Sequence, residues 1–184
     1  GVDASATTPG WMRRRLERSG IRPISALVDI TNYVMLEFGQ PLHAFDNARL
    51  SGAIHVRMAR KRESIMLLNE QTLELQEDVL LIADERRPVA MGGIMGGADT
   101  GITSVTTEVF LESAFFAQNA LASRPRWYNF ISDASHRFER GVDFGGTRRA
   151  LERATRLIID ICGGQAGPLS EALATLPERP PVRL

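Results

Sequence analysis

Apolar residues recur at helical spacing in stretches near both ends of the chain. The first predicted helix covers residues 9–18, with proline at its first position, and the second covers residues 24–38. The clearest helical period spans residues 145–162, where the pattern stops at Gly163. A shorter helix is predicted over residues 117–123.

The middle of the chain is predicted to form short strands instead. They cover residues 54–58, 65–68, 72–75, 79–83, 89–91 and 109–112, with a short extended segment at 41–46. Residues 132–137 are polar and are predicted to be irregular. Helices at both ends of a multi-stranded middle indicate an α+β fold.

The two ends of the sequence differ in composition from its middle. Residues 1–8 and the proline-rich residues 172–184 are predicted to be linkers, the second leading toward a following domain. One domain is therefore expected over residues 9–171. The absence of an initiator methionine indicates a piece cut from a longer polypeptide.

Two glycine pairs, Gly92-Gly93 and Gly96-Gly97, lie between the apolar runs at 89–91 and 109–112. Glycine pairs leave the backbone uncovered, so a ligand can approach it closely, and Glu112 is a lone acid at the edge of an apolar strand. A tight bend with a solvated Glu112 explains the pattern equally well. The spacing fits neither a P-loop nor a dinucleotide-binding loop.

Charge and cysteine content narrow the function classes. The chain has 22 basic and 22 acidic residues, so it lacks the net positive charge typical of non-specific nucleic-acid binders. Any RNA contact is expected to be local, and RNA binding by this piece alone to be weak. The single Cys162 excludes an intramolecular disulfide, and no apolar run approaches 18 residues, so we expect a cytoplasmic protein and no membrane contact.

His43 stands apart from the other two histidines. It lies between Leu42 and Phe45, after a predicted helix that carries Thr31 and Asn32. A histidine in apolar surroundings is commonly a core residue, but a nearby polar cluster favours a binding site. His55 is expected to be exposed, whereas His136 is expected to form structural hydrogen bonds.

The sequence argues against several kinds of catalytic centre. No two histidines have the spacing of a zinc site, so no metal is predicted. The sequence has no Gly-x-Ser-x-Gly motif, and Cys162 ends a helix predicted to be buried. If the protein is an enzyme, water is the expected nucleophile.

Long blocks of the sequence resemble one known family. They are residues 18–25, 28–37, 39–46, 93–97, 111–116 and 136–143, and they are similar to the B3/B4 region of the bacterial phenylalanyl-tRNA synthetase β subunit. The resemblance extends from about residue 9 to residue 171. It implies a B3/B4-type fold, here a multi-stranded β-sandwich-like core flanked by helices.

The resemblance also implies an activity, the hydrolysis of tyrosine mis-attached to phenylalanine tRNA. A hydrophobic pocket for phenylalanine rejects an added hydroxyl by only on the order of 10²-fold, so a second, phenol-selective site is needed. The family residue matched by Glu112 accepts a hydrogen bond from the tyrosine hydroxyl. His43, Thr31 and Asn32 match residues that hold the aminoacyl end and the attacking water.

The remaining matched positions would shape the substrate site. Gly93, Gly96 and Gly97 match a loop where tyrosine approaches the backbone, and Ala134 matches a small residue that leaves room for the ring. Ser132 replaces the threonine common in the family, which keeps the hydroxyl but loses a methyl. Two routes for the attack by water are left open. His43 can act as a base, or the water can be held in position and helped by the tRNA's own terminal hydroxyl.

Partners and alternatives follow from the same resemblance. Expected partners are the aminoacylated phenylalanine tRNA and the synthetase α subunit, in a heterotetramer of two α and two β subunits that uses ATP and magnesium for protein biosynthesis. No cofactor is expected in this domain. A non-catalytic tRNA-docking or structural module, and an independent deacylase, are the alternative interpretations.

Overall fold

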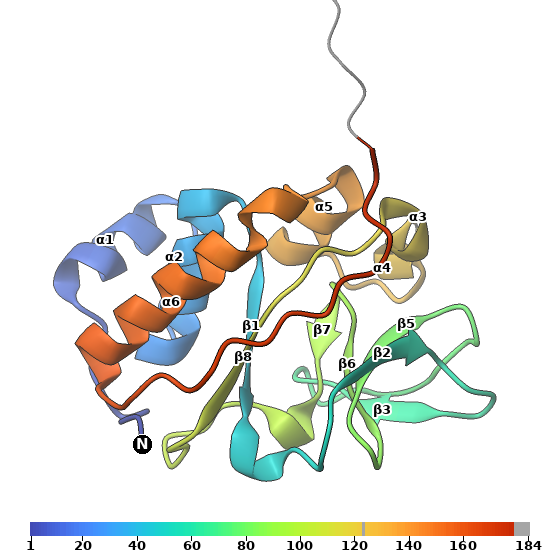
Figure 1. The fold of residues 1–184 in the computed structure, drawn as a ribbon, viewed down its shortest axis with the longest axis horizontal. Helices are drawn as coiled ribbons and strands as arrows, with labels where there is room; N and C mark the ends of the chain where they lie inside the picture. Colours follow the sequence, from blue (N-terminus) through green and yellow to red (C-terminus); the bar gives the residue numbers. More distant parts are fainter. Residues whose placement is uncertain (123, 179–184) are drawn as a thin grey trace, which may run out of the picture.

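A computed structural model describes residues 1–122 and 124–178 of the 184-residue chain. Its fold is α+β, as predicted: three longer helices lie to one side of the antiparallel sheets, and shorter helices lie beside the sheets (Figure 1). The predicted linker 172–184 lies outside the described residues from position 179 onward, and the domain limits stay a prediction. Val2 and Asp3 nevertheless donate backbone hydrogen bonds to the carbonyls of Thr107 and Cys162, at 2.7 and 2.8 Å.

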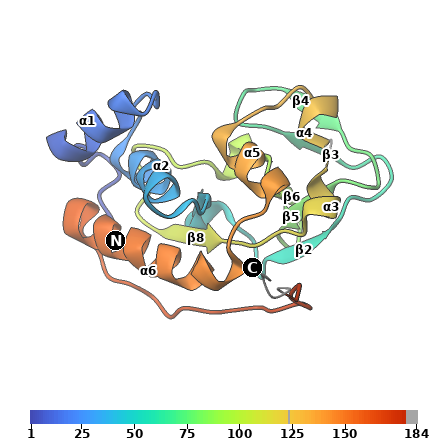
Figure 2. The same cartoon turned by 90° about the horizontal axis from the view of Figure 1, so that it is seen from above.

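Three helices form a layer on one side of the molecule (Figure 2). They are α1 (Gly10–Arg18), α2 (Ala26–Phe38) and α6 (Thr147–Cys162), close to the predicted ranges. Their apolar faces meet in a common core that includes Met12, Leu16, Leu27, Ile30, Ala154 and Leu157. No helix among the described residues is long and apolar enough to cross a membrane.

The strands in the described ranges form small antiparallel sheets. A four-stranded sheet has the order β2 (His55–Met58), β5 (Leu80–Ala83), β6 (Pro88–Met91) and β7 (Met95–Gly96). Strands β3 (Ser64–Met66) and β4 (Thr72–Glu74) form a hairpin. Strand β1 (Leu42–Asp46) pairs with β8 (Val109–Ser113), far away in sequence.

The β1–β8 pair lies between the helical layer and the four-stranded sheet (Figure 1). Because side chains alternate along a strand, Leu42 and Leu111 face the helical core. Phe45 and Phe110, on the opposite face, pack toward Ile82 and other residues of the four-stranded sheet. Both faces of this pair are therefore covered.

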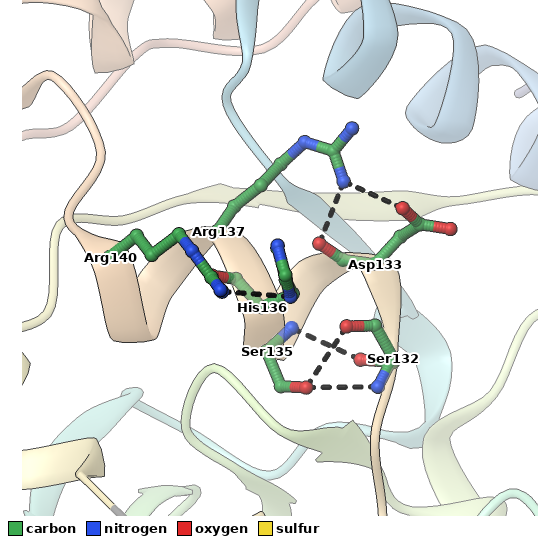
Figure 3. A network of polar contacts seen from close by, with 6 residues as sticks. All are labelled: Ser132, Asp133, Ser135, His136, Arg137 and Arg140. Atoms are coloured by element: carbon green, nitrogen blue, oxygen red, sulfur yellow. Dashed lines mark hydrogen bonds and ion pairs between the residues drawn. The ribbon is translucent and has the colours of Figure 1, made fainter.

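The prediction that residues 132–137 are irregular is wrong. Residues Asp133–Arg140 form helix α5, which begins at a capping box: the Ser132 hydroxyl accepts from the Ser135 N–H, and the Ser135 hydroxyl accepts from the Ser132 N–H (Figure 3). Arg137 also donates to the Asp133 carboxylate and carbonyl. Cap interactions start this helix, although its sequence offers few large apolar residues.

The remaining elements are short. Helices α3 (Gln118–Leu121) and α4 (Arg124–Trp127) precede α5, and α3 is shorter than the predicted helix 117–123, whose last residue lies outside the described part. The 3₁₀ turns are η1 (Asn47–Arg49), η2 (Ala98–Thr100) and η3 (Phe144–Gly146).

Candidate functional site

His43 and Glu112 lie directly opposite each other in the register of β1 and β8. Opposed residues on antiparallel strands extend from the same face, with Cβ atoms about 5 Å apart. Both residues keep some exposed surface, yet the Nε2 atom of His43 is buried without a hydrogen-bond partner among the described residues. Within that same part of the chain, no hydrogen bond to the Glu112 carboxyl accompanies its burial.

Burial moves the titration of these two groups in opposite directions, because it disfavours whichever form is charged. It lowers the pKa of His43 to about 4 and raises the pKa of Glu112 to about 7. At neutral pH the imidazole is therefore uncharged, and the carboxyl group is divided between its protonated and ionised forms. Such shifts are typical of functional sites.

A cavity of about 70 Å³ contains both groups. Its lining comes from strands β1, β5, β6, β7 and β8, from Pro41 before β1, from the glycine turn after β6, and from Ala134 and Phe138 of α5. The imidazole of His43 also meets the edge of Phe45, with ring centroids 4.4 Å apart at 74°. A mostly apolar cavity with two polar groups is the usual form of a ligand site.

The glycines matched to the substrate loop have different environments. Gly93 has a φ of +68° and lines the cavity, while a Cβ on Gly96 would lie 2.4 Å from Cε1 of His43. Gly97 does not line this cavity; a Cβ there would lie 2.7 Å from the Val89 carbonyl oxygen. Gly97 thus allows close backbone packing, and Gly96 leaves space for the imidazole.

Thr31 and Asn32 lie in a neighbouring, larger pocket of about 260 Å³. It also contains Ser132, and its lining shares Pro41, Leu42 and Ala134 with the smaller cavity. The Thr31 hydroxyl donates to the Val28 carbonyl oxygen at 2.8 Å. Apart from Gly97, which lines neither pocket, the structure therefore divides the matched residues between two adjoining pockets, with Ala134 at the boundary.

The other histidines lie away from these pockets. His55 is exposed on strand β2, and His136 is exposed on α5 with its Nδ1 atom 2.8 Å from Nη1 of Arg140 (Figure 3). No group of three metal-binding side chains occurs among the described residues.

Gln40 is a residue near the site that the sequence reasoning missed. Its side chain is buried and its Nε2 atom donates to the carbonyl oxygens of Pro41 and Ala114, at 3.0 and 2.8 Å. The sequence does contain a signal for this role: a glutamine precedes a proline at the start of a strand. Proline has no N–H to donate, and the glutamine amide can supply one.

Residues 1–163 match the family described as the B3/4 domain. The chain therefore belongs to the B3/4 domain family. Among solved structures, it is similar to an N-terminal fragment of the phenylalanyl-tRNA synthetase beta-subunit from Pyrococcus horikoshii. That similarity has 16% sequence identity and a TM-score of 0.42, over 63% of this chain and 40% of that chain.

Several relatives carry one name, phenylalanine–tRNA ligase beta subunit. The protein from Dechloromonas aromatica (strain RCB) is 69% identical over 184 residues, which are all of this chain and 23% of that protein. The protein from Aromatoleum aromaticum is 68% identical over 186 residues, covering all of this chain and 24% of that protein. The chain thus spans about a quarter of the length of these curated relatives.

Proposed function

We propose that this chain is the editing domain of a phenylalanine–tRNA ligase β subunit, and that it hydrolyses the ester joining tyrosine to phenylalanine tRNA. The observation that supports it most strongly is the pair His43 and Glu112 in this cavity: the Nε2 atom of His43 is buried without a hydrogen-bond partner among the described residues, and burial raises the pKa of the Glu112 carboxyl group. Leaving such groups unpaired costs about 1–3 kcal/mol each, so a ligand that satisfies them gains selectivity.

Glu112 is proposed to recognise the tyrosine hydroxyl. The phenol O–H donates to the carboxylate, whereas phenylalanine leaves that carboxylate buried and unpaired. A site built to hydrogen-bond a hydroxyl rejects an analogue without it far more strongly than an apolar pocket rejects an extra hydroxyl. The editing site would thereby make the opposite choice from the aminoacylation site.

The adjoining pockets suggest how the substrate would lie. The phenol would enter the inner cavity, and the ester would lie in the outer pocket beside Thr31 and Asn32. A cavity of about 150 Å³ binds benzene, so the inner cavity of about 70 Å³ must widen as the ring enters. The flexible side chains of Met91 and Met95 in its lining can move to allow this.

The proposed reaction adds water to the ester carbonyl carbon, breaks the bond to the ribose oxygen, and returns a proton to that oxygen. His43 is uncharged at neutral pH, and its buried Nε2 atom can accept a hydrogen bond from water once the cavity widens. Its lowered pKa makes it a weak base, so we assign it to positioning the water. The terminal hydroxyl of the tRNA is the group that can assist proton transfer.

The whole ligase is part of the same proposal. Its partners would be the α subunit and aminoacylated phenylalanine tRNA, and its location the cytoplasm. ATP and magnesium would serve aminoacylation at a site outside this chain, and this domain would need no cofactor for hydrolysis.

The test is deacylation of tyrosyl-tRNA, made on phenylalanine tRNA, by the assembled ligase. His43→Ala and Glu112→Ala are compared with matched controls, His55→Ala and Glu74→Ala, which replace exposed strand residues. We expect the native enzyme and both controls to clear tyrosine and to spare phenylalanine, and the two site variants to fail. Equally slow hydrolysis by all five enzymes would instead support a tRNA-docking or structural module.

A further inference from the structure

The β1–β8 pair reaches a proline at the end nearest the site. The strands end at Leu42 and Ser113, and extending their register by one residue sets Pro41 opposite Ala114. At the other end of the pair, the Asn47 N–H donates to the Glu108 carbonyl oxygen at 2.9 Å. Hydrogen-bonded pairs alternate along an antiparallel ladder.

The positions of these hydrogen-bonded pairs can be counted along the strands. Asn47 and Glu108 form a hydrogen-bonded pair, and every second pair along the ladder is also hydrogen-bonded. Counting from there, the hydrogen-bonded positions include His43 with Glu112 and then Pro41 with Ala114. At the Pro41 position, the ladder requires an N–H that donates to the Ala114 carbonyl oxygen. Proline has no N–H, so the ladder lacks a donor one pair beyond His43 and Glu112.

The side chain of Gln40 supplies a donor at this place. Its Nε2 atom lies 2.8 Å from the Ala114 carbonyl oxygen and 3.0 Å from the carbonyl oxygen of Pro41. Gln40 is 2% exposed, so water does not compete freely for these carbonyl groups. The Oε1 atom of Gln40 is buried without a hydrogen-bond partner among the described residues.

We propose that Gln40 is a positioning residue for the site: its side-chain amide replaces the N–H that Pro41 lacks and holds β1 and β8 together beside His43 and Glu112. The effect on hydrolysis rests on the proposed function, whereas the effect on strand pairing does not. The two hydrogen bonds that Nε2 donates support the assignment, because they engage the N–H groups of this amide at the place where the backbone lacks one.

Removing the donor takes this hydrogen bond from the part-buried Ala114 carbonyl group at the end of a short ladder. The β1–β8 strand pair then separates from this end. The first residues to lose their alignment are His43 and Glu112, two residues away. Loss of one hydrogen bond corresponds to a change of about tenfold in rate. A displacement of 1 Å in a catalytic constellation can cost more.

The experiment uses the assembled ligase carrying Gln40→Leu, which has similar size but no donor. The matched control is Gln118→Leu, since Gln118 also donates to a backbone carbonyl, that of Glu139, but is exposed. A second variant adds Pro41→Ala to Gln40→Leu, which returns a backbone N–H opposite Ala114. Pro41→Ala alone is measured beside it.

Two readouts are taken from each enzyme. Hydrogen exchange followed by mass spectrometry on peptides covering residues 109–116 reports the strand pairing. Deacylation of tyrosyl-tRNA reports the site. For Gln40→Leu we expect exchange about tenfold faster and kcat/KM about tenfold lower, with both values largely restored by Pro41→Ala. The Gln118→Leu control should match the native enzyme in both.

The outcomes separate the two proposals. Native-like exchange in Gln40→Leu, or a loss that Pro41→Ala does not restore, overturns the positioning role, since general packing damage would not be repaired by a new N–H. If the native enzyme fails to deacylate while exchange still responds to Gln40→Leu and recovers, the editing function is wrong and the strand-pairing role of Gln40 stands.

Discussion

Gly96 lies so close to the imidazole of His43 that a Cβ built on it would be 2.4 Å from Cε1 and 2.6 Å from Nε2. The side chain of His43 therefore occupies space that every other residue at position 96 would need. We expect Gly96→Ala to displace the imidazole and to reduce tyrosyl-tRNA deacylation roughly 10²-fold, the scale of a 1 Å misplacement. Aminoacylation, measured on the same enzyme, should be unchanged.

Gly92→Ala is the matched control for this prediction. Gly92 belongs to the same glycine turn, but a Cβ there would meet nothing nearer than 3.4 Å. It should keep native deacylation. Equal activity in Gly96→Ala and Gly92→Ala would show that the position of the imidazole does not govern hydrolysis.

The sequence predicted the regular elements better than the start of α5. Periodic apolar residues such as Leu27 and Leu157 identify helices that bury one face, and α2 and α6 follow the predictions closely. Helix α5 has Phe138 as its single large apolar residue, so its period is weak. The cap formed by Ser132 and Ser135 starts it, and two serines three apart are common outside helices as well.

The site residues named from the sequence stay predictions, and the sequence did not show how the structure groups them. Thr31 and His43 are close in the chain, but they lie in different pockets, Thr31 on α2 and His43 on the strand that packs against it. Gly96 ends β7 and Gly97 follows it, but successive residues of an extended chain face opposite sides, so one meets His43 and the other meets backbone. Such differences depend on tertiary packing, which a single sequence does not specify.

Glu112 should make stability depend on pH. Its pKa is raised by burial from 4.5 to about 7, so the folded protein binds this proton more tightly than the unfolded chain does. The stabilisation is complete below pH 4.5 and is lost as the pH rises through 7. Glu112→Gln stays neutral, and its unfolding free energy relative to native should increase by up to about 3 kcal/mol between pH 4 and pH 8.

His43 makes stability depend on pH in the opposite sense, with the loss at low pH. Its pKa is lowered from 6.5 to about 4, so its contribution is present above pH 6.5 and is lost as the pH falls through 4. The two groups oppose each other between pH 4.5 and 6.5, and Glu112→Gln should reveal the His43 effect there. Urea unfolding of the chain at a series of pH values measures this. A constant difference between Glu112→Gln and native at all pH values would contradict the burial of the carboxyl group.

Ser132 offers a test of how the outer pocket is supported. Its hydroxyl accepts a hydrogen bond from the Ser135 N–H at 3.1 Å and thereby caps α5, which carries Ala134 into both pockets. Ser132→Ala should lower the unfolding free energy by about 1 kcal/mol, and Ser132→Thr should retain the cap. Ser104→Ala, at an exposed turn, is the control in urea unfolding. If Ser132→Ala is no less stable than Ser104→Ala, the cap contributes nothing measurable.

Selectivity for tyrosine should itself depend on pH, because Glu112 titrates near neutrality. The ionised carboxylate accepts a charge-assisted hydrogen bond from the phenol, which is roughly twice as strong as a neutral one. Phenylalanine leaves the same carboxylate buried and unpaired, and this penalty also grows on ionisation. Tyrosine should lower and phenylalanine should raise the pKa of Glu112 from its value of about 7 in the free protein, so the ratio of kcat/KM for tyrosyl-tRNA to that for phenylalanyl-tRNA should rise with pH between these two values. Glu112→Gln should give a low, flat ratio, and a flat native profile would mean that the ionisation of Glu112 does not select the substrate.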